Sequence, residues 1–255
     1  MKQSLNENEF LWPTEEPAPR NNYAIPVAVV LAGMIIAGAL IFTSNQQPTN
    51  IKSSAGSVLS SREPEPTTQA VDINKVNISG RPFIGKANAK ITMAYWYDYQ
   101  CPFCKKFELE TMPSLIADYI ASGDIKIVFK NFQFLGDDSQ IAGLVGQAVW
   151  EIAPDKFYQW HSAVYEKQDS ENSGWGAKED IVALAASFGI DPLKLNDLLA
   201  SKVVKYQKIL DDDFAEGKSF GIGGTPTAII EKRLIIGAQP YFEIRQVIDQ
   251  VLAKI

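Results

Sequence analysis

The only two cysteines of this chain lie three positions apart, in the segment DYQCPFCKKF at residues 98–107. The apolar run ITMAYWY, at residues 91–97, comes directly before them and predicts a buried strand. Apolar residues at helical spacing follow as far as Ala121, with Pro102 suited to the first helical position and Pro113 expected to kink the helix. The cysteines therefore mark a corner at which a strand passes into a helix, and any fold must accommodate that corner.

A cysteine at the start of a helix is favoured as a thiolate. Unpaired backbone N–H groups and the positive end of the helix dipole point toward the position that Cys101 occupies. Thiols so placed in C-x-x-C motifs have pKa values lowered from about 8.5 to roughly 3.5–7. Cys104 follows one turn later and can attack a mixed disulfide formed on Cys101. The spacing favours an attacking and a resolving thiol over a static disulfide or a pair of inert buried thiols.

Three neighbours are expected to tune the thiols: Pro102, Phe103 and Asp98. Phe103 neither donates a side-chain hydrogen bond nor carries a charge, so we expect a less depressed thiol pKa than in a C-P-H-C site. Asp98 could accept a proton from the thiol or raise its pKa by repulsion, and burial decides between these effects.

Composition excludes several classes of function. The formal net charge of -6, and the absence of a Lys/Arg run longer than two, argue against nucleic acid as a partner. The two cysteines and His161 make only three of the four ligands that a structural zinc site needs. We therefore expect no metal and no organic cofactor. We assign no role to His161, which we expect to be a packing or surface residue, and we expect Asp211–Asp213 to lie on a solvated helix face.

An apolar run near the N-terminus, AIPVAVVLAGMIIAGALIF at residues 24–42, contains no charged residue. A helix of this length spans roughly 28 Å, about the hydrocarbon thickness of a bilayer. Residues 1–23 are polar and acidic, so they are predicted to be disordered and lack the basic region of a signal peptide. We expect a retained single transmembrane helix rather than a cleaved signal peptide. Arg20 weakly favours a cytoplasmic N-terminus.

The remaining chain is predicted to form a flexible linker at 43–75 and one folded domain at 76–255. The linker is rich in Ser, Thr, Pro and Gln. Within the domain we expect a mixed central sheet covered by helices, an α/β fold. Its further strands are predicted at 125–129, 227–231 and 234–236, and its further helices at 139–151, 154–166, 178–188, 192–200, 202–219 and 241–254.

A second motif, GIGGTPTA at residues 221–228, precedes a predicted strand. Because proline lacks an N–H, Thr225 can offer its backbone to an extended peptide beside Pro226. A cis bond before Pro226 would be a special feature, whereas an ordinary trans proline at a strand start is the more common arrangement.

Together these segments resemble the DsbA-like thiol–disulfide oxidoreductases of the thioredoxin superfamily. The resemblance covers about residues 84–255 and rests on GKANAKITMAYWYDYQCPFCKKF, IKIVFKNF, QAVWEIAPDKFYQWHSAVY, GIGGTPTAII and IIGAQPYFEIRQVI. It implies a thioredoxin-like fold with an all-helical insertion at about 137–200, here preceded by a transmembrane helix. It also implies that Cys101 is the solvent-exposed nucleophile, that Cys104 resolves the mixed disulfide, and that Thr225-Pro226 is a cis-proline loop that binds substrate backbone.

Two departures from the family pattern bear on the strength of oxidation: Phe103 replaces a histidine, and Tyr95 replaces a buried acid. We expect a membrane-anchored enzyme that exchanges disulfides with extracytoplasmic protein substrates, promotes oxidative folding and works with an unidentified membrane redox partner, an oxidase or a reductase. The alternatives are a reductase or isomerase of the same fold, and a non-catalytic tethered peptide-binding module.

Overall fold

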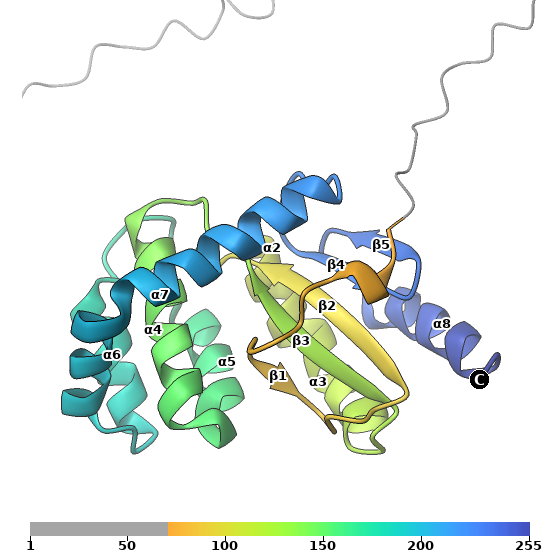
Figure 1. The fold of residues 1–255 in the computed structure, drawn as a ribbon, viewed down its shortest axis with the longest axis horizontal. Helices are drawn as coiled ribbons and strands as arrows, with labels where there is room; N and C mark the ends of the chain where they lie inside the picture. The colour runs from red at the N-terminus through yellow and green to blue at the C-terminus, as the bar shows by residue number, and fades with distance from the viewer. Residues whose placement is uncertain (1–70) are drawn as a thin grey trace, which may run out of the picture. The chain divides into compact units, whose positions relative to one another are not determined.

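The computed structural model describes residues 71–255 (Figure 1). The predicted tail at 1–23, the apolar run at 24–42 and the linker at 43–70 lie outside the described residues. Within residues 71–255, no helix is both long enough and apolar enough to cross a membrane.

A five-stranded mixed sheet lies at the centre, in the strand order β1-β3-β2-β4-β5. Strands β2 and β3 are parallel, and the other three pairings are antiparallel. This confirms the predicted α/β fold; the two-residue strand β1 was too short for the sequence pattern to reveal. The strands are β1 (Phe83–Ile84), β2 (Ile91–Tyr97), β3 (Ile125–Asn131), β4 (Thr227–Ile230) and β5 (Arg233–Ile236).

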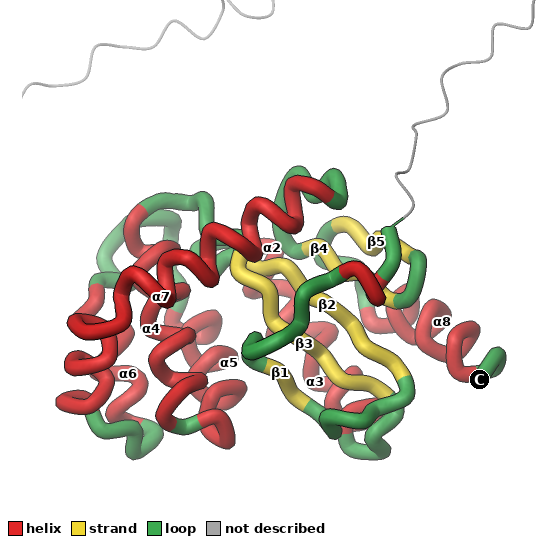
Figure 2. Tube along the Cα trace, in the orientation of Figure 1, coloured by secondary structure: helices red, strands yellow, loops and turns green. Residues whose placement is uncertain are grey.

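Successive side chains of β2 enter two separate clusters, because neighbouring residues of a strand point to opposite faces. Met93, Tyr95 and Tyr97 join the larger core cluster, and Ala94 and Trp96 join the smaller one. The larger cluster includes Ile244 and Ile248 of helix α8 (Tyr241–Leu252), which packs beside β2 (Figure 2). Both faces of the central strand are therefore buried.

The helix that follows Cys101 alternates between α-helical and π-helical winding. It consists of α2 (Pro102–Lys106), the π-helical segment η2 (Phe107–Thr111), α3 (Met112–Leu115) and the π-helical segment η3 (Ile116–Ile120). Pro113 lies in α3, directly after the first wide segment. Since proline has no N–H to donate, a widened turn at this point allows the helix to continue past it.

A helical block separates β3 from β4. It contains α4 (Asp137–Ile152), η4 (Pro154–Lys156), α5 (Phe157–Lys167), α6 (Lys178–Ser187) and α7 (Pro192–Ser219). The prediction of two helices at 192–200 and 202–219 was wrong, because α7 is one helix of 28 residues. Ser201 does not break it, since its hydroxyl donates to the Asp197 carbonyl at 2.6 Å. The implied insertion at about 137–200 therefore has no break at its C-terminal end, and α7 reaches from the block to the sheet (Figure 1).

The segment at 71–75 was wrongly predicted to be linker. Val71 and Ile73 are buried in the smaller cluster with Trp96, and η1 (Ile73–Lys75) is a short 3-10 helix. The Ile73 N–H donates to the Glu231 carbonyl at 2.8 Å. The three apolar residues in VDINKV are too few to show a helical or strand periodicity in the sequence, but they cover the second face of the sheet.

A buried ion cluster fixes α7 to the sheet. Asp213 is fully buried and pairs with Arg81, at 2.8 Å from Nε to Oδ1, and with Lys130 of β3, which is also fully buried. Lys130 pairs in addition with Glu216 at 2.9 Å. The expectation that Asp211–Asp213 lies on a solvated face therefore holds for Asp211 and Asp212, which are exposed, and is wrong for Asp213. Helical geometry turns the third acid toward the sheet.

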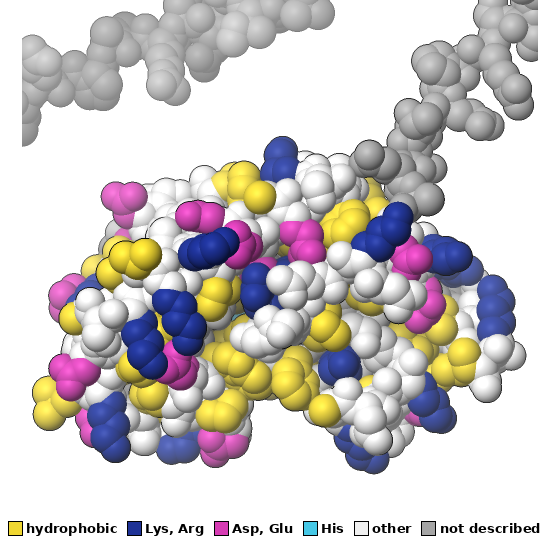
Figure 3. Space-filling model, in the orientation of Figure 1, with side chains coloured by type: hydrophobic (Ala, Val, Ile, Leu, Met, Phe, Trp, Pro, Cys, Tyr) yellow, Lys and Arg dark blue, Asp and Glu magenta, His cyan; other side chains and the backbone are white. Residues whose placement is uncertain are grey.

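Charges of both signs are interspersed over the face shown in Figure 3. This pattern is unlike the concentrated basic footprint that phosphate binding requires.

Candidate active site

Cys101 lies at the corner between β2 and α2. It occupies the N-cap position with an extended backbone, φ -76° and ψ 119°, and Pro102 is the first helical residue. Its N–H donates to the Asp98 carbonyl at 3.2 Å, which closes a turn after the strand. The residue is only 5% exposed, so it is more enclosed than the solvent-exposed nucleophile that the family resemblance implied.

The structure brings Cys101 and Thr225 together from segments far apart in the sequence. In the free thiol form, Cys101 Sγ donates to the Thr225 carbonyl oxygen at 3.3 Å. The Thr225-Pro226 peptide bond is cis, and the Pro226 carbonyl accepts from the Gly237 N–H at 2.8 Å. The backbone of the 225–226 loop thus lies beside the first thiol.

Hydrogen bonds stabilise the thiolate of Cys101. The Cys104 thiol makes the largest contribution, followed by the Thr225 side chain and the backbone N–H groups of Cys104 and Phe103, and together they outweigh burial and lower the pKa of Cys101 to about 6. Phe103 itself is 63% exposed and takes part only through its backbone. This agrees with the general effect of a helix N-terminus on a thiol.

Cys104 has the opposite environment. It is fully buried one turn into α2, and burial raises the pKa of its thiol well above the ordinary value, an effect that the neighbouring Cys101 reinforces. The two pKa values are driven apart. Cys101 is the thiol that ionises first, and Cys104 keeps its proton.

We expect the thiolate absorbance of the reduced protein to titrate with a midpoint near pH 6, the pKa of Cys101. A cysteine in an unfolded chain ionises near about 8.5. Because the folded-state pKa is the lower one, ionisation of Cys101 stabilises the folded dithiol increasingly as pH rises from about 6 to about 8.5, and the contribution is lost as pH falls through the folded value. The Cys101→Ser variant supplies the blank, and a midpoint near that of free cysteine would contradict the expectation.

Asp98 is buried, but its carboxylate is occupied by other donors. It accepts the N–H groups of Gln100 at 2.8 Å, Phe134 at 2.7 Å and Leu135 at 3.1 Å, and the Ser139 hydroxyl at 2.5 Å. Burial raises the pKa of Asp98, and these hydrogen bonds oppose the rise. The side chain therefore ties the active-site loop to the start of α4, an arrangement that differs from the proton-accepting role considered from sequence. The backbone N–H of Asp98 makes a hydrogen bond to Cys104, which lowers the pKa of that thiol and partly opposes burial.

Residues from α5 and just beyond it also hold the active-site loop, and sequence reasoning missed them. Gln168 donates to the carbonyls of Tyr99 at 2.7 Å and Cys101 at 3.2 Å, and Tyr165 donates to the Asp98 carbonyl at 3.2 Å. Lys105 donates to the Gln168 carbonyl at 2.7 Å. No local motif marks these residues, because their partners lie more than 60 positions away.

The core contains a group of buried polar side chains that includes His161. This histidine is fully buried, and its Nδ1 lies 2.8 Å from the Tyr99 hydroxyl. Its Nε2 lies 3.7 Å from Oε2 of Glu108, a buried residue of η2 that the sequence analysis did not single out. His161 is therefore a packing residue of the core, one of the two placements expected from the sequence. It also lies against a carboxylate, which was not expected.

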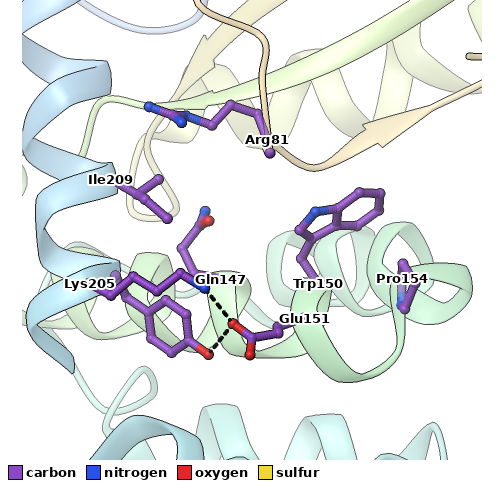
Figure 4. A pocket seen from close by; sticks show the side chains of 9 residues that line it. Arg81, Gln147, Trp150, Glu151, Pro154, Lys205 and Ile209 are labelled. Atoms are coloured by element: carbon purple, nitrogen blue, oxygen red, sulfur yellow. Dashed lines mark hydrogen bonds and ion pairs between the residues drawn. The ribbon is translucent and has the colours of Figure 1, made fainter. Parts of the chain in front are cut away.

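A cavity of about 430 Å³ lies elsewhere, between α4, α7 and the segment before β1. Lys205 donates across it to Glu151 at 2.9 Å (Figure 4). Neither thiol, nor Thr225, is among the residues that line it. In the part of the chain from 71 to 255, no group of three or more His, Cys, Asp or Glu side chains is arranged to hold a metal ion.

Comparison with known proteins agrees with this geometry. A family model described as "Thioredoxin" matches residues 78–250. Disulfide bond formation protein D of Bacillus subtilis is 32% identical over 177 residues, which cover 69% of this chain and 79% of that protein. The oxidised crystal structure of BdbD from Bacillus subtilis aligns with a TM-score of 0.65 at 31% identity, over 71% of this chain and 97% of the other. The thiol-disulfide exchange protein alpha-DsbA2 of Wolbachia pipientis aligns with a TM-score of 0.60 at 25% identity, over 67% and 87% respectively.

Proposed function

The chain belongs to the thioredoxin family, as a DsbA-like thiol–disulfide oxidoreductase, and from this premise we propose that it forms disulfides in proteins outside the cytoplasm. One observation carries the proposal. Cys101 lies at a helix N-cap beside the 225–226 loop, with a pKa lowered to about 6, while Cys104 beside it is fully buried.

The low pKa of Cys101 favours the oxidising direction. Stabilising its thiolate stabilises the reduced form of the enzyme, so the Cys101–Cys104 disulfide gives up its oxidising equivalents readily. A thiol of low pKa is also a good leaving group in exchange. The disulfide bond formation proteins that resemble this chain carry a name that agrees with this direction.

The reaction proceeds in two exchanges. A substrate thiolate attacks Sγ of Cys101 in the enzyme disulfide, and Cys104 leaves as a thiolate that takes up a proton. A second substrate thiolate then attacks the substrate sulfur of the mixed disulfide, and Cys101 leaves as its stable thiolate. Two electrons pass from substrate to enzyme, which a membrane redox partner re-oxidises. The electrons reside in the two thiols, so these steps need neither an organic cofactor nor a metal.

Substrate recognition is proposed to use the backbone beside the thiols. The Thr225 carbonyl faces Cys101 Sγ, so a peptide lying extended along the 225–226 loop would bring its own cysteine to that sulfur. Backbone recognition of this kind is independent of sequence and suits an enzyme that acts on many unfolded proteins.

The location of the enzyme is also proposed. The uncharged run at 24–42 supports a single membrane anchor with a cytoplasmic N-terminus, and the polar stretch after it supports a flexible tether. The catalytic domain would then lie outside the cytoplasm, where disulfides form and persist.

The Cys104→Ser variant tests the mechanism. Without the resolving thiol, Cys101 is expected to attack an oxidised test protein and to accumulate as a mixed disulfide, seen as a covalent complex on a non-reducing gel. The wild type should show the complex only transiently. Absence of the complex in the variant would contradict the assignment of Cys101 as the nucleophile.

The direction of exchange is tested separately by equilibration with glutathione. A reduction potential well above about -270 mV, the value for thioredoxin, is expected if the enzyme is an oxidant, since about 30 mV already changes the equilibrium constant tenfold. A value near that of thioredoxin would favour the reductase over the oxidase.

A further inference from the structure

Four buried polar atoms in one place have no hydrogen-bond partner within residues 71–255. They are both carboxylate oxygens of Glu108, the Tyr95 hydroxyl and Nε2 of His161. Glu108 is 1% exposed, and Tyr95 and His161 are fully buried. Leaving such groups unpaired in the interior is costly, and most buried polar atoms do find partners. A cluster of four is therefore an indication of a role other than stability.

The cluster extends from Cys104 to the histidine. Glu108 lies one helical turn after Cys104, on the same face. Tyr95 of β2 packs in the same buried cluster as Cys104, and its ring stacks on Phe107, the residue before Glu108, with centroids 5.1 Å apart. Burial is the main reason that the pKa of its hydroxyl is raised, and Cys104 and then Glu108 raise it further. Glu108 Oε2 in turn lies 3.7 Å from His161 Nε2.

The surroundings of Glu108 contain no basic partner other than His161 within residues 71–255. Within residues 71–255 it forms no ion pair with a lysine or arginine. The ionisable groups that face it come from α2, β2, the active-site loop and α5, and are Cys104, Tyr95, Tyr99, Tyr158 and His161. Among these groups, only the His161 ring can carry a positive charge.

When Cys104 leaves the enzyme disulfide it needs a proton, and solvent cannot supply that proton directly. It is fully buried, so the thiolate that it becomes on leaving the enzyme disulfide is strongly disfavoured. The other carboxylate nearby, that of Asp98, is occupied by four donors. The Tyr95 hydroxyl and the Glu108 carboxylate, which the Tyr158 hydroxyl also approaches, remain.

Building on the proposed function, we propose that Glu108, paired with His161, supplies the proton that Cys104 takes up when it leaves, with the Tyr95 hydroxyl as the link. The S–S bond of the enzyme breaks as the substrate sulfur bonds to Cys101. Tyr95 gives its proton to the Cys104 thiolate and regains one from the Glu108–His161 pair, which later recovers it from solvent. When Cys104 attacks instead, the proton moves in the opposite direction.

The Glu108→Gln variant tests this, because glutamine keeps the size of the side chain but does not ionise. We expect reduction of the Cys101–Cys104 disulfide by dithiothreitol to slow on the order of 100-fold at neutral pH, the usual contribution of a positioned acid or base, and the pH dependence of the rate to lose one inflection. The thiolate titration of Cys101 should stay near pH 6. Tyr95→Phe should slow the same step.

Glu110→Gln is the matched control, since Glu110 is exposed on the same helical segment and its variant should react as the wild type does. Wild-type rates and pH profile in both Glu108→Gln and Tyr95→Phe would overturn the inference. The trapping experiment separates the inference from the proposed function. Capture of a test protein by Cys101 in Cys104→Ser needs no proton on Cys104, so it should be unchanged when Glu108→Gln is added. Slower capture in the double variant would overturn the inference, because Glu108 would then act on Cys101 or on folding rather than on Cys104.

Discussion

Replacing Cys101 with serine is expected to reduce the oxidation of a reduced test protein to the background rate. A hydroxyl cannot form the mixed disulfide, and the pKa of about 6 that makes Cys101 both attacking and leaving group belongs to this sulfur alone. Cys104 cannot replace it, because Cys104 is fully buried and burial raises the pKa of its thiol. The measurement is the rate at which thiols of an unfolded test protein disappear.

The same variant separates an enzyme from a binding module. Serine is close to cysteine in size, so Cys101→Ser should unfold at the same denaturant concentration as the reduced wild type at a pH below about 6, where the Cys101 thiolate contributes no stability. If the variant still protects or folds substrate proteins as well as the wild type does, exchange is not the basis of the function, and a non-catalytic peptide-binding role would be favoured.

Replacing Asp213 with alanine is expected to lower the free energy of unfolding by about 3–5 kcal/mol, the usual cost of removing one partner from a buried ion pair. The change leaves Arg81 and Lys130 as cations that are 8% and 0% exposed. It also removes the acceptor of the Asn131 N–H, which lies 3.1 Å from Oδ2. Denaturant unfolding monitored by tryptophan fluorescence provides the measurement, because Trp96 donates to the Asp213 carbonyl.

Asp212→Ala is the matched control for this prediction. Asp212 precedes Asp213 on α7 but is exposed, where it pairs with Lys208 at 2.7 Å. Exposed pairs of this kind contribute about 0–1 kcal/mol. Equal losses of stability in the two variants would show that the cluster does not hold α7 on the sheet in the way that the geometry indicates.

The strands and the active-site corner were predictable because their signals are local. ITMAYWY is apolar throughout and matches β2 residue for residue, and the proline after Cys101 marks the helix start. The single helix α7 was not predictable, since Ser201 reads as a break unless its hydroxyl is known to bond within the helix. The predicted boundary between linker and domain was wrong for a similar reason, because the burial of Val71 and Ile73 depends on partners far away in the sequence.

The surroundings of the thiols were the least predictable part of the site. Gln168 holds the loop from 67 positions away, and Glu108 meets His161 only because η2 and α5 pack together. In the sequence Glu108 is one of four charged residues at positions 105–110, and His161 is one polar residue among aromatic ones. Nothing in the spacing of either residue distinguishes it from a surface position.

For this protein the sequence by itself determined the α/β class, the position of Cys101 at the start of a helix and the spacing of the two thiols, because short-range backbone preferences and side-chain periodicity decide these features. Only the tertiary structure decided how deeply each thiol is buried, which backbone faces the first sulfur, and that Asp213 and Glu108 are interior carboxylates. These properties depend on contacts between segments far apart in the chain, and burial, which sets the cost of a charge, exists only once those segments have packed.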